Sequence, residues 1–519
     1  MTAAAHNSAS WLVDRHVTEG RGERVAIRCD GVDTTYAELQ TELFRAQNAL
    51  AELGVGSGER VALVLDDDVA FPAWFLGAQR SGVVPVPLST MLTGTELGPI
   101  IADSGATTVV ISGTYTDAVG PIMAAAPAVA TVVVDGEAGA VSAEHSGARV
   151  EAWTSFADRS VCPAADTTVE SPAFWLYSSG TTGVPKGVMH LHGSPRATAR
   201  TYADNVLHVT EDDRFLSVAK LFFAYGLGNS LTFPFSVGAT AILHPHPPTP
   251  ASFAELIATE RPTLLFSSPG FCAALLDMAP SPDTFRSVRA TVTAGESLPA
   301  DVQQRFSSLS GTPVLDGIGS TELLHIFISN TLDHQTPGSS GVPVPGYVAE
   351  LRNDADEVVT ETDTPGYLHV QGPSSAVGYH DRPDATAASF RDGWVRTGDV
   401  YVRSADGSYT FLGRNNDMIK AGGIWVSPAE VESALIEHPD VLEVAVVGAR
   451  NDDGLEEVVA FVVPASGAEP DPVALEQHCR ERMASFKRPR RILVVDELPK
   501  TATGKIQRFA LRSALDQAG

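Results

Sequence analysis

The segment Tyr177-Ser178-Ser179-Gly180-Thr181-Thr182-Gly183-Val184-Pro185-Lys186-Gly187 combines four Ser and Thr hydroxyls, three glycines and one lysine. It follows an apolar run at 173–176, which predicts a buried strand. Glycines let backbone N–H groups approach a ligand closely, hydroxyls donate to phosphate oxygens, and a lysine neutralises phosphate charge. We therefore expect this loop to bind the phosphates of a triphosphate.

The order of residues in this loop differs from the Walker pattern, in which Ser or Thr follows the lysine. Here Lys186 follows Pro185 and precedes Gly187. This context argues against a P-loop phosphotransferase. An isolated loop of this composition is also typical of a flexible surface segment, an alternative that the further motifs of the chain argue against.

Length and charge set the broad class of the protein. A chain of 519 residues is long enough for at least two domains, and its 44% hydrophobic and 19% charged content is typical of globular proteins. The formal net charge is −27, from 63 acidic and 36 basic residues. Nucleic acids and anionic membranes select clustered Lys and Arg, so we expect neither as a partner.

The cysteines and the first residues predict the compartment. The four cysteines lie far apart without a C-x-x-C pair, so neither a disulfide framework nor a thiolate metal site is expected. Residues 1–6 lack a basic region followed by an apolar core, which predicts no signal peptide. No apolar run approaches the roughly 20 residues of a membrane helix. We expect a cytoplasmic protein.

Helical and strand patterns alternate in the first third of the chain. A capping box at 35–38 predicts the start of an amphipathic helix that ends at Gly54, and a second helix is expected to end at Gly82. Strands are expected at 60–65, 83–88 and 107–112. This alternation predicts a parallel sheet covered by helices, with the prolines of the second strand placing it near an edge.

The alternation resumes after Lys186, with strands expected at 262–268 and 290–294 that end in loops rich in Gly, Ser and Glu. Ligands of open α/β sheets bind at the carboxyl ends of strands, so these are candidate binding loops. Residues 338–413 instead show short apolar runs separated by Gly, Pro and Asp, which is typical of an antiparallel unit. The predicted fold is α/β, with two α/β subdomains, a small β-barrel-like unit and a small α+β C-terminal domain.

Five further motifs follow the phosphate loop in order. They are 294–299 (Ala-Gly-Glu-Ser-Leu-Pro), 316–322 (Asp-Gly-Ile-Gly-Ser-Thr-Glu), 394–399 (Trp-Val-Arg-Thr-Gly-Asp), 413–420 (Gly-Arg-Asn-Asn-Asp-Met-Ile-Lys) and 499–506 (Pro-Lys-Thr-Ala-Thr-Gly-Lys-Ile). The ordered set resembles the adenylate-forming superfamily of acyl-CoA synthetases, carrier-protein-loading adenylation domains and beetle luciferase. The resemblance covers nearly the whole chain and implies ATP-dependent activation of a carboxylate.

The chemistry of adenylation explains these residue types. A carboxylate is a poor acyl donor, so it attacks the α-phosphorus of ATP, forming an acyl-adenylate and releasing pyrophosphate. Bringing an anion to a triphosphate requires Mg²⁺, lysine and backbone N–H groups around the transition state. The resemblance implies that the β- and γ-phosphates are held by Ser178, Ser179, Gly180, Thr181, Thr182, Gly183 and Lys186.

The same resemblance assigns the rest of the nucleotide site. Thr321 and Glu322 are implied to act at the α-phosphate, with Glu322 also binding Mg²⁺. Asp399 is implied to accept both ribose hydroxyls, because a carboxylate offers two acceptor oxygens, and Arg414 to add a ribose or phosphate contact. The other implied nucleotide-binding residues are Gly295, Glu296, Ser297, Asp316, Gly317, Ile318, Gly319 and Ser320, of which 295–297 and 316–318 line the adenine. The family commonly has an aromatic at the position of Ile318, so the packing there is expected to be aliphatic.

The C-terminal residues are implied to serve the two half-reactions in turn. The resemblance divides the chain into an N-terminal domain, residues 1–414, and a mobile C-terminal domain, residues 415–519. In one orientation the ammonium of Lys505 bridges the carboxylate nucleophile and the α-phosphate.

In the other orientation the segment that begins at Lys420 is implied to face the site, and Gly422 and Gly423 form a tunnel for the thiol substrate. The family's hinge position is usually Asp or Lys, whereas this chain has Asn416. Asn tolerates unusual backbone angles, but the departure leaves the pivot open.

Residues 220–229 (Lys-Leu-Phe-Phe-Ala-Tyr-Gly-Leu-Gly-Asn) and 320–327 (Ser-Thr-Glu-Leu-Leu-His-Ile-Phe) look like the benzoate–CoA ligase branch. The first supplies the aromatic Phe223 and Tyr225 with the small Ala224 and Gly226, which favours a short, flat pocket for an aryl ring. The second supplies His325 and Ile326 as the opposite wall. Benzoate is the expected acid, with substituted benzoates and small heteroaryl acids open, whereas a long fatty acid needs a tunnel that these bulky residues argue against.

The expected acceptor is the thiol of CoA. The alternative is the phosphopantetheine arm of an acyl carrier protein, which presents the same thiol, and the basic run at 487–491 suits either acceptor. Two other classes remain as alternatives. Nothing in the sequence favours a luciferase-like oxygenase, and the presence of Lys186, Glu322, Asp399 and Lys505 argues against a non-catalytic binding protein.

Overall fold

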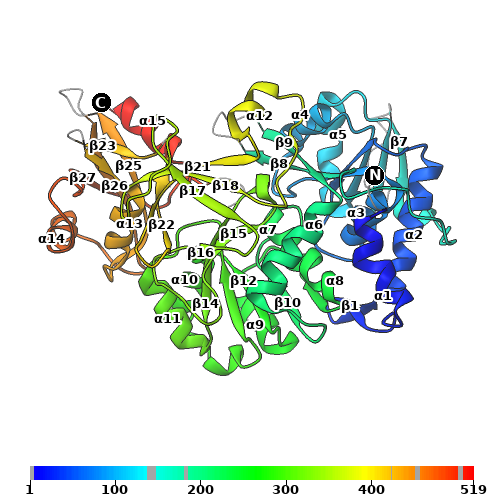
Figure 1. The fold of residues 1–519 in the computed structure, drawn as a ribbon, viewed down its shortest axis with the longest axis horizontal. Coiled ribbons are helices and arrows are strands. Elements are labelled where there is room, and N and C mark those ends of the chain that lie inside the picture. Colours follow the sequence, from blue (N-terminus) through cyan, green and yellow to red (C-terminus); the bar gives the residue numbers. More distant parts are fainter. Residues whose placement is uncertain are drawn as a thin grey trace.

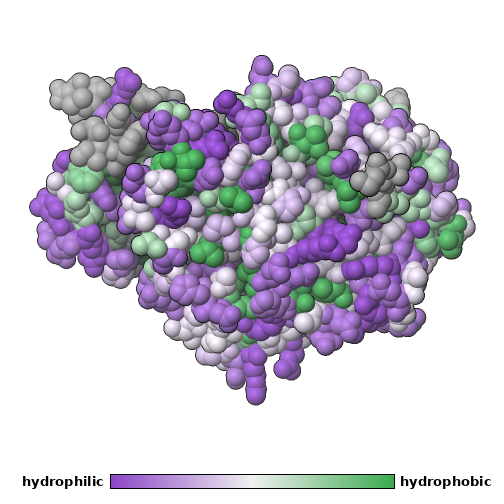
Figure 2. All heavy atoms as spheres, in the orientation of Figure 1, coloured by the Kyte–Doolittle hydropathy of each residue, from purple (hydrophilic) through white to green (hydrophobic). Residues whose placement is uncertain are grey.

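The computed structural model describes residues 5–136, 148–179, 185–415, 417–421, 424–450, 456–500 and 506–518. Figure 1 shows a mixed α/β molecule with the N-terminal elements (blue) at one end, the C-terminal elements (orange and red) at the other, and the middle of the chain (green) between them. Figure 2 shows that the same face is largely hydrophilic, as the many charged residues predict. No helix among the described residues is long and apolar enough to cross a membrane.

The first sheet is parallel and has the order β4-β3-β5-β6-β7. Its strands are β3 (Arg60–Val64), β4 (Val84–Pro87), β5 (Thr108–Ser112), β6 (Thr131–Asp135) and β7 (Arg149–Ala152). The proline-containing β4 is an edge strand, as predicted, because proline has no N–H for a second ladder.

The helices of this part are α1 (Arg15–Thr18), α2 (Tyr36–Glu52), α3 (Ala70–Ser81), α4 (Gly94–Ser104) and α5 (Val119–Ala125). α2 begins at the predicted capping box, in which Thr35 and Glu38 each accept a hydrogen bond from the other's backbone N–H. α3 ends at Gly82, whose φ of 77° closes the helix in the left-handed region.

The second sheet has nine strands in the order β16-β15-β14-β13-β12-β10-β11-β1-β2. They are β1 (Val25–Cys29), β2 (Val32–Thr35), β10 (Arg214–Ser217), β11 (Thr240–Leu243), β12 (Leu264–Ser267), β13 (Ala290–Thr293), β14 (Val314–Gly319), β15 (Ile326–Ser329) and β16 (Val342–Pro343). The N-terminal β1 pairs in parallel with the distant β11, which no local pattern indicated. Because β12, β13 and β14 are parallel neighbours, the loops after them meet at one edge.

The helices around the second sheet are α6 (Gly193–Thr198), α7 (Ala224–Leu227), α8 (Phe233–Val237), α9 (Pro250–Glu260), α10 (Pro269–Asp277) and α11 (Ala300–Ser310). A separate three-stranded sheet has the order β19-β9-β8. It is formed by β8 (Pro172–Ser179), β9 (Pro185–Leu191) and β19 (Gly378–Tyr379). The predicted buried strand before the phosphate loop is therefore β8, whose residues 173–176 are buried.

The predicted antiparallel unit is present. Its strands are β17 (Val348–Arg352), β18 (Gly366–Gln371), β20 (Phe390–Arg391), β21 (Trp394–Arg403) and β22 (Tyr409–Arg414), with α12 (Pro383–Ser389) between β19 and β20. All the pairings among these strands are antiparallel. The motif residues Asp399 and Arg414 lie here, on adjacent strands.

The C-terminal elements form an α+β unit with its own apolar core. They are β23 (Ile419–Ala421), β24 (Ile424–Val426), α13 (Pro428–Ile436), β25 (Val441–Arg450), β26 (Glu456–Pro464), α14 (Pro472–Arg482), β27 (Arg491–Val494) and α15 (Arg508–Ala518). Leu412 of β22 accepts a hydrogen bond from the Ser427 hydroxyl, which caps α13. This contact joins the unit to the antiparallel sheet.

Candidate active site

The predicted phosphate loop connects β8 to β9. The register places Ser178 opposite Lys186 and Tyr177 opposite Gly187. A Cβ on Gly187 would lie 3.1 Å from the Tyr177 ring, so glycine lets the strands approach here. Gly180, Thr181, Thr182, Gly183 and the side chain of Ser179 lie outside the described residues. The hairpin therefore brings together the two ends of the predicted loop.

The base of this hairpin is tied to the first sheet by contacts that the sequence did not indicate. The Tyr177 hydroxyl donates to Asp103 Oδ2 at 2.7 Å, and Arg382 donates to the other carboxylate oxygen of Asp103 at 2.6 Å. Asp103 belongs to α4, so one carboxylate connects this helix with β8 and with the residues after β19. Such contacts fix where the phosphate loop begins.

A tyrosine that no sequence motif singled out lies between two predicted site residues. The Tyr379 hydroxyl donates to Glu322 Oε1 at 2.8 Å, and Lys186 Nζ lies 5.1 Å from the centre of the Tyr379 ring. Tyr379 is 8% exposed, and burial raises the pKa of its hydroxyl. One neutral side chain therefore contacts both the predicted phosphate-binding lysine and the predicted metal-binding carboxylate.

The turn that carries Glu322 is held by three successive carbonyl groups. Thr321 O accepts from the His190 ring at 2.8 Å, Glu322 O from Ala376 N at 2.8 Å, and Leu323 O from the Ser374 hydroxyl at 2.7 Å. Leu324, directly after the turn, has a φ of 66°. A non-glycine residue in this region is strained, and such strain persists only where surrounding contacts fix the backbone.

The predicted ribose residues lie together. Arg414 Nε is 3.0 Å from Asp399 Oδ1, and the two residues are directly opposite in the β21–β22 register. The Asp399 side chain is 5% exposed and the Arg414 side chain 48%. A carboxylate that offers two acceptor oxygens beside a half-exposed cation suits recognition of two hydroxyls on adjacent carbons, as in a ribose.

Asp316, within β14, is one of the buried residues among those predicted to line the adenine. It is 5% exposed and accepts a hydrogen bond from the Thr293 hydroxyl at 3.0 Å. Burial raises the pKa of its carboxyl to about 8. By contrast, Gly295, Glu296 and Ser297 are exposed in the loop after β13, and Ile318 is partly buried. The parallel pairing of β13 with β14 brings both predicted adenine segments to one edge.

Replacing Asp316 by Asn is expected to remove a pH-dependent loss of stability. The folded pKa of about 8 lies above the ordinary value of 3.8, so between these values the folded protein holds a proton that the unfolded chain releases. This contribution is full below pH 3.8 and is lost as the pH rises through about 8. The melting temperature of nucleotide-free Asp316→Asn is measured relative to that of the wild type. This difference should be more favourable to the variant at about pH 8.5 than at about pH 5. If the melting temperatures of the variant and the wild type differ by the same amount at both pH values, Asp316 is not protonated in the folded protein.

The two predicted walls of the acyl pocket meet. The His325 ring lies 5.4 Å from the Tyr225 ring and 4.5 Å from the Phe233 ring, measured between centres. His325 Nε2 is 3.0 Å from Asn229 Oδ1, and Asn229 donates its amide to the Ser217 hydroxyl. Burial lowers the pKa of His325 to about 3, so the ring is neutral and Nε2 carries the proton.

The remaining pocket residues divide by exposure. Phe223, Ala224 and Tyr225 are partly exposed, whereas Gly226 and Ile326 are buried. The Tyr225 hydroxyl donates to Val292 O of β13 at 3.1 Å, which fixes that ring against the second sheet. Phe223 instead packs edge-on against Phe222, beside the core of the first sheet. The aromatic segment therefore lies between the two subdomains.

A buried carboxylate supports this aromatic segment from the first sheet. Both oxygens of Asp67 accept from Leu221 N, at 3.1 and 3.3 Å, and burial raises the pKa of Asp67 to about 6. The neighbouring Lys220 donates to the carbonyl groups of His244 and His246. The sequence did not predict this role of Asp67, because a run of three aspartates at 66–68 is typical of a solvent-exposed turn.

The predicted C-terminal site residues fall largely outside the described residues. Lys505, Asn416, Gly422 and Gly423 are among those outside, so their roles stay predictions. The backbone of Lys420 belongs to β23 and pairs with Trp425 of β24, while its side chain is outside the description.

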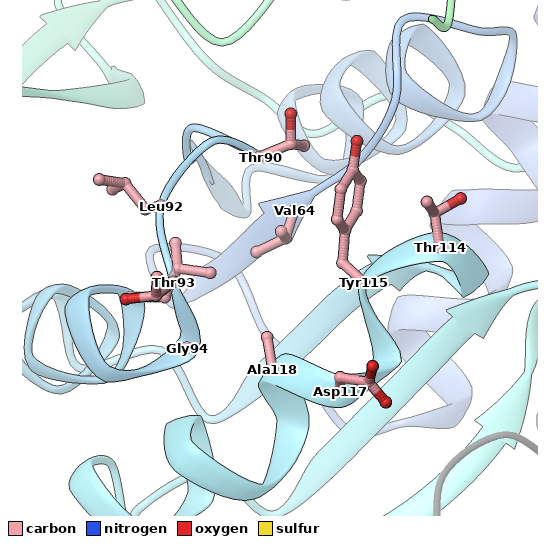
Figure 3. A pocket seen from close by; sticks show the side chains of 10 residues that line it. Val64, Thr90, Leu92, Thr93, Gly94, Thr114, Tyr115, Asp117 and Ala118 are labelled. Atoms are coloured by element: carbon pink, nitrogen blue, oxygen red, sulfur yellow. The ribbon is translucent and has the colours of Figure 1, made fainter. Parts of the chain in front are cut away.

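A separate cavity of about 270 Å³ opens beside the first sheet (Figure 3). Its wall combines Tyr115 and Asp117 with five threonine and leucine side chains, four of them at or just before α4. The Tyr115 hydroxyl donates to Asp66 at 2.6 Å. None of the predicted site residues lines this cavity, so it is distinct from the site built above.

Comparison of the sequence and the structure with known proteins identifies a family and several similar enzymes. Residues 13–380 match the family model of the AMP-binding enzymes, and residues 430–505 match the model of the AMP-binding enzyme C-terminal domain. The benzoate–CoA ligase of Thauera aromatica is 43% identical, over 98% of this chain and 96% of the relative.

Two solved structures are similar over nearly their whole length. A benzoate CoA ligase from Burkholderia xenovorans has a TM-score of 0.89 at 40% identity, covering 98% of this chain and 99% of that structure. An anthranilate CoA ligase in complex with anthranoyl-AMP has a TM-score of 0.92 at 35% identity, covering 99% and 98% respectively.

Proposed function

The chain belongs to the AMP-binding enzyme family, in the benzoate–CoA ligase-like branch of the adenylate-forming superfamily, and on this premise we propose that it converts an aryl carboxylic acid to its CoA thioester. The carboxylate attacks the α-phosphorus of ATP, which gives an aryl-adenylate and pyrophosphate. The CoA thiolate then attacks the acyl carbon and releases AMP. The observation that carries this proposal is the meeting of Tyr225 and His325 in a chain so similar to benzoate–CoA ligases.

In the first half-reaction the phosphate loop, with Ser178 and Lys186 at its ends, holds the β- and γ-phosphates. Thr321 and Glu322 serve the α-phosphate, and Asp399 with Arg414 holds the ribose. The adenine packs against 295–297 and 316–318. The hydrogen-bonded backbone around Glu322 supports this assignment, because preorganised groups stabilise developing charge without reorganising.

The donor set suits Mg²⁺ bound together with ATP. Mg²⁺ usually takes one or two carboxylates in addition to substrate phosphates and water. Among the described residues, no group of three or more His, Cys, Asp or Glu side chains is placed to hold a metal alone, and Glu322 supplies one carboxylate. Mg²⁺ bound at Glu322 would neutralise phosphate charge. Tyr379 and the three anchored carbonyl groups of the turn would hold Glu322 in place.

The aryl ring of the acid packs beside the contact between the two walls, against the aromatic segment, with Phe223, Ala224, Tyr225 and Gly226, and against His325 and Ile326. Neutral His325 and the rings around it present flat, uncharged surfaces. A flat aryl acid fills such a pocket better than a flexible chain. Benzoate is therefore the proposed substrate, with substituted benzoates and small heteroaryl acids as related candidates.

The second half-reaction is proposed to use the C-terminal domain, residues 415–519, after it turns about Asn416. Lys505 serves adenylation, and the segment of Lys420, Gly422 and Gly423 then lines the path of the thiol. CoA is the proposed acceptor, and the phosphopantetheine arm of an acyl carrier protein is the alternative, because both present the same thiol.

A panel of acids tests the proposal. Pyrophosphate release is measured with ATP and Mg²⁺ for benzoate, hydroxy- and aminobenzoates, cyclohexanecarboxylate and hexanoate. Cyclohexanecarboxylate is the matched control, because its ring has benzoate's size without its flatness. We expect benzoate or a substituted benzoate to give the highest kcat/KM. If hexanoate or a longer acid exceeds every aryl acid, the pocket assignment is wrong.

A second measurement with the same enzyme identifies the thiol acceptor. Thioester formation is measured with CoA and with a phosphopantetheinylated acyl carrier protein at equal thiol concentration. Faster transfer to CoA supports the CoA ligase assignment. Faster transfer to the carrier protein makes the chain a carrier-loading enzyme with the same adenylation step.

A further inference from the structure

A short segment joins the phosphate hairpin to the turn that carries Glu322. Residues 374–380, called here the bridging segment, contact both. On one side Val377 N donates to Met189 O at 2.9 Å and His380 N to Gly187 O at 2.8 Å, both on β9. On the other side Ala376 N and the Ser374 hydroxyl donate to the carbonyl groups of Glu322 and Leu323.

Tyr379 is the side chain that completes this connection. Its backbone lies opposite Val188 in the β19–β9 register, so its ring is held beside the start of β9. There Lys186 Nζ lies 5.1 Å from the ring centre, within the range of a cation–π contact. The hydroxyl reaches Glu322 Oε1 at 2.8 Å.

The packing around the ring leaves little freedom for another arrangement. The Phe390 ring lies edge-on to Tyr379 at 5.4 Å between centres, and Tyr379 is 8% exposed. Val188 and Ala376 share the same small apolar cluster. Two acceptors lie within reach of the Tyr379 hydroxyl, Glu322 Oε1 at 2.8 Å and the Ser389 hydroxyl at 3.4 Å, and the shorter contact is the one to the carboxylate.

A hydrogen bond on one carboxylate oxygen fixes the rotation of the whole group. Among the described residues, Tyr379 is the one that donates to the Glu322 carboxylate. Partners of a metal-binding carboxylate orient it and typically change metal affinity or activity about 10- to 100-fold when they are removed.

We propose that Tyr379 is a positioning residue for adenylation, which orients the Glu322 carboxylate toward Mg²⁺ and keeps Lys186 at the phosphates. The inference rests on the proposed function, since it takes Glu322 as the metal-binding group. It adds a residue that links the lysine of the phosphate loop to that carboxylate through one side chain.

The test is Tyr379→Phe, which removes the hydroxyl and keeps the ring. ATP binding is measured by calorimetry over a range of Mg²⁺ concentrations, and this readout needs no acid substrate. We expect the Mg²⁺ concentration for half-maximal ATP binding to rise about tenfold, the lower end of the range for such partners. Transfer from pre-made aryl-adenylate to CoA is expected to be unchanged. An unchanged Mg²⁺ dependence would falsify the proposal.

Two comparisons separate positioning from a general structural effect. Tyr36→Phe also removes a buried tyrosine hydroxyl bond, the one to Ala239 O at 2.7 Å, and is expected to change thermal stability without moving the Mg²⁺ dependence. In a Glu322→Gln background, Tyr379→Phe should add no further Mg²⁺ shift. A shift that persists without the carboxylate means that Tyr379 acts elsewhere. If no aryl acid in the panel supports pyrophosphate release, the proposed substrate is wrong. The Mg²⁺ dependence of ATP binding can still be interpreted, because it is measured without an acid.

Discussion

Lys505→Ala is expected to abolish most of the adenylation activity and to spare thioester formation. An ammonium that bridges the attacking carboxylate and the α-phosphate stabilises charge that develops in the first transition state alone. Loss of one such electrostatic stabiliser lowers kcat by about a hundredfold to a thousandfold. The measurement is aryl-acid-dependent pyrophosphate release, compared with CoA thioester formation from pre-made benzoyl-adenylate.

Lys500→Ala is the matched control for this variant. Lys500 belongs to the same motif, is exposed, and pairs with Glu443 at 2.6 Å rather than with any predicted site residue. An exposed ion pair contributes little, so both half-reactions should proceed as in the wild type. If Lys505→Ala loses both half-reactions equally, the assigned role is wrong, because removing a residue that acts only in adenylation should leave thioester formation unchanged.

Gly226→Ala is expected to be the most damaging small substitution in the proposed acyl pocket. A Cβ at this position would lie 2.0 Å from Lys220 O and 2.5 Å from Ala219 O, both backbone atoms. The backbone of the aromatic segment must therefore move, and overpacking of this kind costs about 1–3 kcal/mol or more. The moved segment carries Tyr225, whose ring faces His325, so we expect a large rise in the KM for benzoate together with a lower melting temperature.

The loss should fall on the acid more than on the nucleotide. ATP binding, measured by calorimetry without acid, is expected to change little in Gly226→Ala, because the ribose and adenine residues lie on other elements. Gly56→Ala is the control, since its Cβ would meet only Glu59 at 3.5 Å, an ordinary contact. If Gly226→Ala binds benzoate as the wild type does, the aromatic segment does not form the acyl pocket.

The positions of the motifs explain how much of the site was predictable. The phosphate loop, the Thr321-Glu322 pair and the separate motifs of Asp399 and Arg414 each occupy a few consecutive residues, because loops at strand ends need particular glycines, hydroxyls and charges. In the structure Arg414 lies 3.0 Å from Asp399 and the Tyr225 ring lies 5.4 Å from the His325 ring, while the binding roles of these residues stay predictions. The roles implied for Lys505, Asn416 and the glycines at 422 and 423 stay predictions.

The groups that hold these motifs were not predictable in the same way. Tyr379 is 57 residues from Glu322, and His190 is 131 residues from Thr321. In the sequence, His190 belongs to a strand and Tyr379 to a loop rich in turn residues, and neither pattern names a partner. The pairing of β19 with β9 places Tyr379 opposite Val188, and the pairing of β8 with β9 places His190 opposite Phe174; neither long-range register is marked in the local sequence.

The sequence by itself determined the α/β fold class and predicted the order of the binding loops and the chemistry of the phosphate loop, because periodicity, turn residues and charge act over a few neighbouring positions. Only the tertiary structure decided that β1 joins the distant β11, that Asp67 supports the aromatic segment and that Tyr379 links Lys186 to Glu322. Each of these depends on close packing between remote segments, whose energy is a property of the assembled core and of no single stretch of chain.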